Sequence, residues 1–227
     1  MREADPTPTL RPARWLLPLV LGLLALLALA ALGVGTRPDA VWLADVRATL
    51  LNPPEGCPIP CWAGIRPGVT TLDEALAILA AHPWVGEIAQ QASDETANSG
   101  TQGSIRWRWN GSQPAPLRTG DDNRLLHIDR IVAYVSLGTI VPLGDMWLLL
   151  GRPERGAFLG QSANSLIGSL DGRRILQVTY LGRGVALEAA WQCPVDWRTY
   201  WQAETTIIFT HRLYGPGDPL RHTLPAC

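Results

Sequence analysis

The chain has 227 residues and a formal net charge of −1. This length is enough for one domain with a sizeable core plus an attachment segment. All of its basic residues are arginine, so a Schiff-base lysine and a phosphate-loop lysine are both excluded. The near-neutral charge leaves no electrostatic footprint for nucleic acid, and no nucleic-acid partner is predicted.

The N-terminal region reads as a means of attachment. Residues 1–14 are polar and proline-rich with three arginines, and residues 15–35 form an apolar run without charge. Such a run, at about 1.5 Å per helical residue, matches a hydrocarbon core of about 30 Å. It predicts a transmembrane helix, and the arginine excess predicts a cytoplasmic tail before it. A cleaved signal peptide is the alternative, with a small-residue site at residues 28–30. The uncleaved anchor is preferred because the apolar run continues past that site.

Residues 36–56 are predicted to be a juxtamembrane linker or short helix, and residues 57–227 an extracytoplasmic domain. Four cysteines in such a domain suggest disulfide bonds. Three pairings are possible, and Cys57–Cys61 with Cys193–Cys227 is preferred. The Cys-x3-Cys spacing, with no histidine at ligand spacing, is a weak zinc signal, so no metal and no cofactor are predicted.

The first element of the domain is a helix with a clear start. Thr71-Leu-Asp-Glu74 is a capping box, and His82-Pro83 ends the apolar periodicity that follows. Residues 104–110 then alternate apolar and polar side chains, which predicts a strand with Ile105, Trp107 and Trp109 facing a core. Further strands are expected at residues 125–137, 174–181, 185–191 and 205–210.

The helix pattern returns later in the chain. Residues 142–153 align with residues 71–83 with one gap, and each segment ends at a proline followed by β-rich sequence. We therefore expect repeats over residues 67–137 and 141–210. The predicted fold class is α+β: an N-terminal transmembrane helix, then a duplicated helix-plus-antiparallel-strands unit with its helices on one face of the sheet.

Two family resemblances accompany these motifs. Pro60-Cys-Trp-Ala-Gly-Ile-Arg-Pro-Gly-Val-Thr70 resembles a motif of uncharacterised bacterial membrane-anchored proteins, and this resemblance covers residues 57–227 without implying an activity. Leu150-Gly-Arg-Pro153, after a helix, is similar to small lipoproteins of outer-membrane barrel assembly and to β-lactamase-inhibitor-like domains. This second resemblance implies two helices on one face of an antiparallel sheet and a role in binding.

Two functions are compared. The favoured one is a membrane-anchored binding or assembly module of the bacterial envelope, a single-pass cell membrane protein with a protein or envelope partner. Its predicted contact patch consists of Trp197, Tyr200 and Trp201, because exposed aromatic clusters mark contact sites. The alternative is an envelope hydrolase, for which His127 and Asp129, expected on one face of a strand, are the best available pair. No nucleophile or metalloprotease motif occurs, so the protein is expected not to be an enzyme, and no catalytic residue is assigned.

Overall fold

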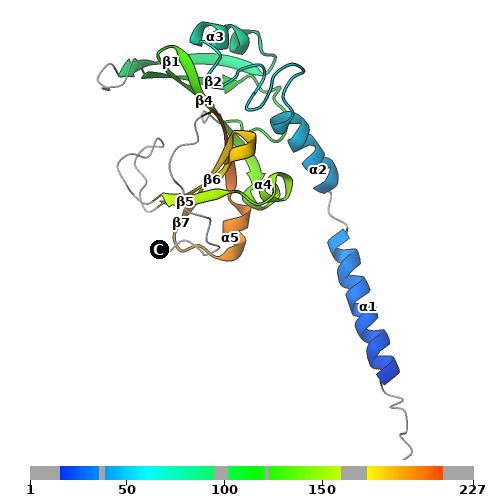
Figure 1. Cartoon of the computed structure of the whole chain (residues 1–227). Helices are drawn as coiled ribbons and strands as arrows, with labels where there is room; N and C mark the ends of the chain where they lie inside the picture. The colour runs from blue at the N-terminus through cyan, green and yellow to red at the C-terminus, as the bar shows by residue number, and fades with distance from the viewer. Residues whose placement is uncertain (1–15, 36–38, 95–101, 121–122, 160–172, 212–227) are drawn as a thin grey trace, which may run out of the picture. The chain divides into compact units, whose positions relative to one another are not determined.

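The computed structural model describes residues 16–35, 39–94, 102–120, 123–159 and 173–211 (Figure 1). The chain divides into two compact units, Met1–Trp42 and Leu43–Cys227. The first unit contains helix α1 (Leu16–Gly35). Helix α2 (Asp39–Val46) follows and continues into the short π-helical segment η1 (Arg47–Leu51).

The transmembrane prediction is corrected by the structure. Among the residues described, no helix meets the combined requirement of length and apolar character for crossing a membrane. The transmembrane helix predicted over residues 15–35 is therefore not found in the described part of the chain.

The second unit is built on one antiparallel sheet of eight strands, in the order β1-β2-β3-β4-β8-β7-β6-β5. Each strand pairs with the next along this order, and β4 joins β8 in the middle through pairs from Tyr134–Thr210 to Gly138–Thr206. The strands are β1 (Val85–Asp94), β2 (Gln102–Trp109), β3 (Asn123–Ile128), β4 (Ile131–Pro142), β5 (Arg155–Leu159), β6 (Arg173–Tyr180), β7 (Val185–Gln192) and β8 (Glu204–Thr210).

This continuous sheet also corrects the predicted duplicated unit. In the described part of the second unit, strand is the most abundant secondary structure, and the helices after η1 are the short α3 (Leu72–Ala81), α4 (Leu143–Leu150) and α5 (Trp197–Gln202). The hydrogen bonds between β4 and β8 connect strands β1–β4 to strands β5–β8. The fold is therefore one large sheet with few helices. Strands β1 and β5, which the periodicity did not predict, form its two edges.

The core follows from the strand register. Leu125 pairs with Ile105 and Val135, and Val135 pairs with Phe209, so these four side chains share one face of the sheet. Each is at most 3% exposed. Helix α3 contacts β1 and β4, while α4 contacts β4, β8 and α5. These contacts bury the apolar sides of the two helices.

The start of α3 confirms the predicted capping box. The Glu74 N–H donates to Thr71 Oγ1 over 3.3 Å, and the Thr71 N–H donates to Glu74 Oε2 over 2.9 Å. The backbone hydrogen bond from Thr71 holds the pKa of Glu74 below its usual value. The carboxylate is thus used to satisfy a helix end, as the sequence indicates.

Candidate functional site

Among the described residues of the second unit, α4 and α5 form an exposed aromatic surface. Helix α5 begins after Asp196, whose Oδ1 accepts a hydrogen bond from the Thr199 N–H at 2.6 Å. Trp197 and Trp201 stand four residues apart and so lie along one side of this helix. The Trp201 ring contacts Trp147 of α4, with 4.8 Å between the ring centroids.

A glycine allows this close approach of the two helices. A Cβ atom at Gly144 would lie 3.3 Å from the carbonyl oxygen of Trp201, so a larger residue would press on α5. Trp197 remains 51% exposed and Leu148 remains 70% exposed. We call the set Trp147, Leu148, Trp197 and Trp201 the α4–α5 surface.

Tyr200, the third residue of the predicted contact patch, is buried. Tyr200 is only 4% exposed, and its ring stacks on Trp191 with 5.0 Å between centroids. Burial raises the pKa of Tyr200 to about 12. Tyr200 therefore fixes α5 to strand β7, while Trp197 and Trp201 face outward to a greater degree.

Sequence reasoning missed Trp147 and Leu148. The alignment of residues 142–153 with residues 71–83 gave neither residue a role in contact with a partner. A signal was nevertheless present, because residues 146–150 are Met-Trp-Leu-Leu-Leu, apolar on every side of a helix. Such a helix in a half-exposed place has an apolar face left over after the core is filled.

The disulfide loop that precedes α3 is structural. Cys57 and Cys61 are bonded, with 6.0 Å between their Cα atoms, which confirms the predicted pair. Cys61 is 3% exposed, and the next residue, Trp62, stacks between His82 and Trp107 at centroid distances of 5.5 and 5.8 Å. Burial lowers the pKa of His82. The loop thus covers the tryptophans of β2.

The other cysteines are accounted for as far as the described residues extend. Cys193 is disulfide-bonded. Its predicted partner, Cys227, lies outside the residues described. In the described ranges, no three histidine, cysteine or acidic side chains are grouped so that they could hold a metal ion.

The histidine and aspartate considered for hydrolysis are not on one strand face. His127 lies on β3, is 7% exposed and packs its ring over Gly103, where a Cβ atom would come within 2.5 Å of Nε2. Burial lowers the pKa of His127, with a smaller effect from Arg130. Asp129 follows the end of β3 in the turn to β4, with a φ of 50°. That turn takes Asp129 out of the strand, so the expected same-face arrangement is wrong.

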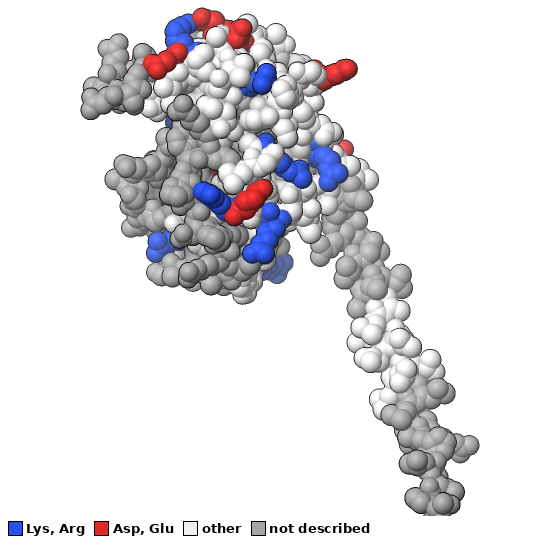
Figure 2. All heavy atoms as spheres, in the orientation of Figure 1, with Lys and Arg blue, Asp and Glu red and all other residues white. Residues whose placement is uncertain are grey.

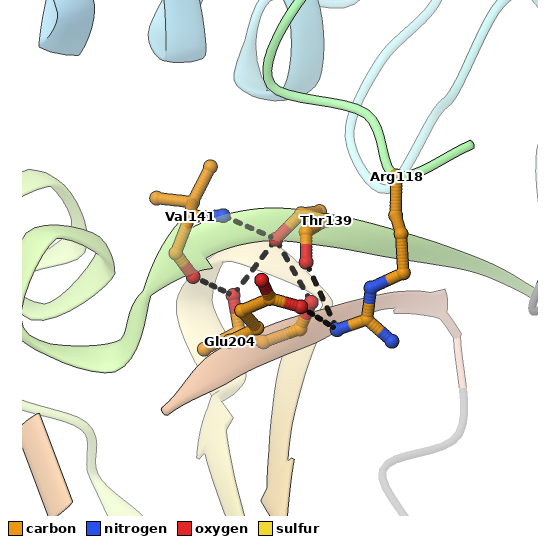
Figure 3. Close-up of polar contacts among 5 residues, drawn as sticks. Arg118, Thr139, Val141 and Glu204 are labelled. Atoms are coloured by element: carbon orange, nitrogen blue, oxygen red, sulfur yellow. Dashed lines mark hydrogen bonds and ion pairs between the residues drawn. The ribbon is translucent and has the colours of Figure 1, made fainter. Parts of the chain in front are cut away.

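A polar network lies where β4 and β8 change register (Figure 3). The Thr139 hydroxyl donates to the Thr205 carbonyl over 2.8 Å and accepts the Val141 N–H over 3.2 Å, while the Thr205 hydroxyl donates to the Val141 carbonyl over 2.9 Å. Arg118 bridges to Glu204 at 2.7 Å. Both threonines are fully buried. The hydroxyls replace ladder hydrogen bonds, so this network serves the fold.

Charge does not single out another site on the face shown in Figure 2, where arginine and acidic side chains are interspersed among neutral residues. The α4–α5 surface therefore stands out by its apolar character. Comparison with known proteins finds no matching family model, no matching curated protein and no matching solved structure.

Proposed function

We propose that the second unit is a binding module that works outside the cytoplasm and holds a protein partner on the α4–α5 surface. The observation that supports this most directly is the exposure of Leu148 and Trp197, at 70% and 51%, on two helices joined by the Trp147–Trp201 contact. Single exposed apolar residues are ordinary, but several of them on two helices that contact each other are typical of contact sites.

Burial of the exposed apolar area of this surface would contribute substantially to the free energy of binding a partner. Covering the exposed half of a tryptophan removes about 100 Å² from water, which at about 25 cal/mol per Å² gives about 2.5 kcal/mol. That is the size of an interface hot spot. Because Tyr200 and Gly144 hold the two helices in place, little ordering cost is added when a partner binds.

The disulfide bonds support the extracytoplasmic location. Cys57–Cys61 is oxidised and Cys193 is also bonded. Disulfides persist in oxidising compartments and are rare in the cytosol. The cytoplasmic position of residues 1–14 stays a prediction, as does the assignment to the bacterial envelope.

Site-specific photo-crosslinking in cells tests the binding proposal. A photoreactive amino acid is placed at Leu148 or at Trp197 in the full chain. The matched control position is Glu87 on β1, whose side chain is 72% exposed but lies outside the α4–α5 surface. We expect a discrete crosslinked protein from positions 148 and 197 and none from position 87.

A second variant distinguishes loss of contact from loss of folding. Leu148→Ser changes an exposed side chain and should leave the thermal midpoint within a few degrees, since exposed substitutions usually change stability by less than about 0.5 kcal/mol. It should reduce crosslinking from position 197 several-fold. Equal crosslinking from all three positions, or none from 148 and 197, would refute the proposal.

A further inference from the structure

A small cavity lies between the disulfide loop and the connection from β6 to β7. Its volume is about 120 Å³. The loop meets the connection at Pro60, whose ring would be 2.7 Å from a Cβ atom at Gly184. The cavity is lined by Leu51, Ile59, Cys61, Arg183, Val185 and Phe209.

The lining combines an apolar floor with one cation. Cys61, Val185 and Phe209 are each at most 4% exposed, and Cys61 is bonded to Cys57, so the lining holds no free thiol. Arg183 is exposed and is the one charged residue of the lining. None of the ion pairs found among the described residues involves its guanidinium.

The position of Arg183 is set by the backbone around it. Arg183 ends the short 3-10 segment Leu181–Arg183, and Gly184 follows in the left-handed conformation with a φ of 60°. The Gly184 N–H donates to the Leu181 carbonyl over 3.3 Å, and the Gly184 carbonyl accepts from the Thr210 N–H over 2.9 Å. The connection is thus tied to strand β8, and the side chain leaves from a fixed point on the cavity rim.

We propose that this cavity binds a small carboxylate with a short apolar tail. A guanidinium presents paired donors that match the two oxygens of a carboxylate. The apolar floor matches a hydrocarbon tail, and an inorganic anion would leave that floor uncovered. An apolar cavity of about 150 Å³ takes up benzene. The slightly smaller cavity of about 120 Å³ found here should therefore accept a tail of roughly four to six carbons.

Isothermal titration of the full chain tests the proposal with hexanoate as the probe. We expect saturable binding with a Kd in roughly the millimolar range, as befits a ligand of so few atoms. Acetate has the head without the tail, and 1-hexanol has the tail without the charge. Each should bind at least about tenfold more weakly, since each lacks one of the two contacts.

Two arginine variants locate the binding. Arg183→Gln should weaken hexanoate binding about tenfold and leave 1-hexanol binding unchanged, because only the charge-assisted contact is lost. Arg152→Gln, at an exposed arginine outside the cavity lining, should leave hexanoate binding unchanged. Unfolding midpoints of both variants check that they fold. No saturable hexanoate binding, or equal binding by Arg183→Gln and the parent, would overturn the proposal.

Discussion

The Pro60 ring lies directly against Gly184, so that a Cβ atom at Gly184 would meet the ring Cγ at 2.7 Å. Gly184 also has a φ of 60°, which side chains with a Cβ atom disfavour. One contact therefore joins the disulfide loop, far away in the sequence, to the connection between β6 and β7.

Gly184→Ala should lower the free energy of unfolding by about 2 kcal/mol or more, from backbone strain and from the clash with a ring held in the loop. Urea unfolding followed by tryptophan fluorescence measures the change. Gly182→Ala is the matched control, because no atom lies within 4 Å of its added Cβ and its φ is not positive. A Gly184→Ala variant as stable as the Gly182→Ala variant would show that the loop does not press on this turn.

Removing the Cys57–Cys61 bond should destabilise the second unit moderately. In the chain-entropy model a loop this short contributes about 2 kcal/mol to the free energy of unfolding. The double variant Cys57→Ser/Cys61→Ser retains the bond at Cys193 and isolates this effect. Guanidinium unfolding monitored by fluorescence reports both stability and the environment of Trp62. An unchanged midpoint would mean that the Trp62 stacking alone holds the loop.

Thr139→Val should cost about 1–3 kcal/mol, because the Val141 N–H loses its acceptor in a fully buried place. The methyl group that replaces the hydroxyl fills nearly the same volume, so packing changes little. Arg118→Gln removes a partly exposed ion pair with Glu204 and a 3.2 Å hydrogen bond to the Thr139 carbonyl, and should cost about 1 kcal/mol. Chemical denaturation ranks the two variants, and faster hydrogen exchange at the Val141 amide identifies the cause. The Thr139 hydroxyl would be unimportant for stability if Thr139→Val unfolded at the parental midpoint.

Glu188 should make stability depend on pH. It is 7% exposed, and its Oε1 accepts a hydrogen bond from Gln177 at 2.9 Å. Burial raises the pKa of Glu188 above 4.5, and Arg124 and the Gln177 hydrogen bond offset only part of the increase. The folded state therefore binds the proton more tightly than the unfolded chain. Its contribution to stability is most favourable below pH 4.5 and is lost as pH rises through the folded pKa.

Glu188→Gln removes this titration and should flatten the pH dependence from pH 4.5 upward. Free energies of unfolding measured across that range, relative to the parent chain, give the slope directly. Glu87→Gln, at a side chain that is 72% exposed, serves as the control and should keep the parental slope. A parental slope in Glu188→Gln would assign the pH dependence to other groups.

Local features of the fold were predictable because their causes are local. The capping box of Thr71 and Glu74 and the Cys57–Cys61 bond depend on residues three or four positions apart. The turn between β3 and β4 was missed because Asp129 and Arg130 both take positive φ without the glycine that usually announces it. The expected single strand over residues 125–137 is therefore two strands.

The arrangement of the sheet was beyond the reach of periodicity. Alternation along a strand says which residues share a face, but it does not say which strand is the neighbour. The β4–β8 pairing joins Tyr134 to Thr210 across a long stretch of chain, and nothing near either residue indicates it. The α4–α5 surface was half predicted for the same reason: Trp197 and Trp201 are neighbours in sequence, whereas Trp147 reaches them only through the fold.

The central place of β8 has a consequence for synthesis on the ribosome. Strand β8 (Glu204–Thr210) is the last strand of the described chain and pairs on both sides, with β4 and with β7. While it is still untranslated, β4 and β7 each present an unpaired edge with apolar side chains, a form prone to association with other chains. During most of translation the two halves of the sheet therefore lack the strand that joins them. Shielding of the exposed β4 and β7 edges by chaperones should matter most until residue 210 has emerged from the ribosome.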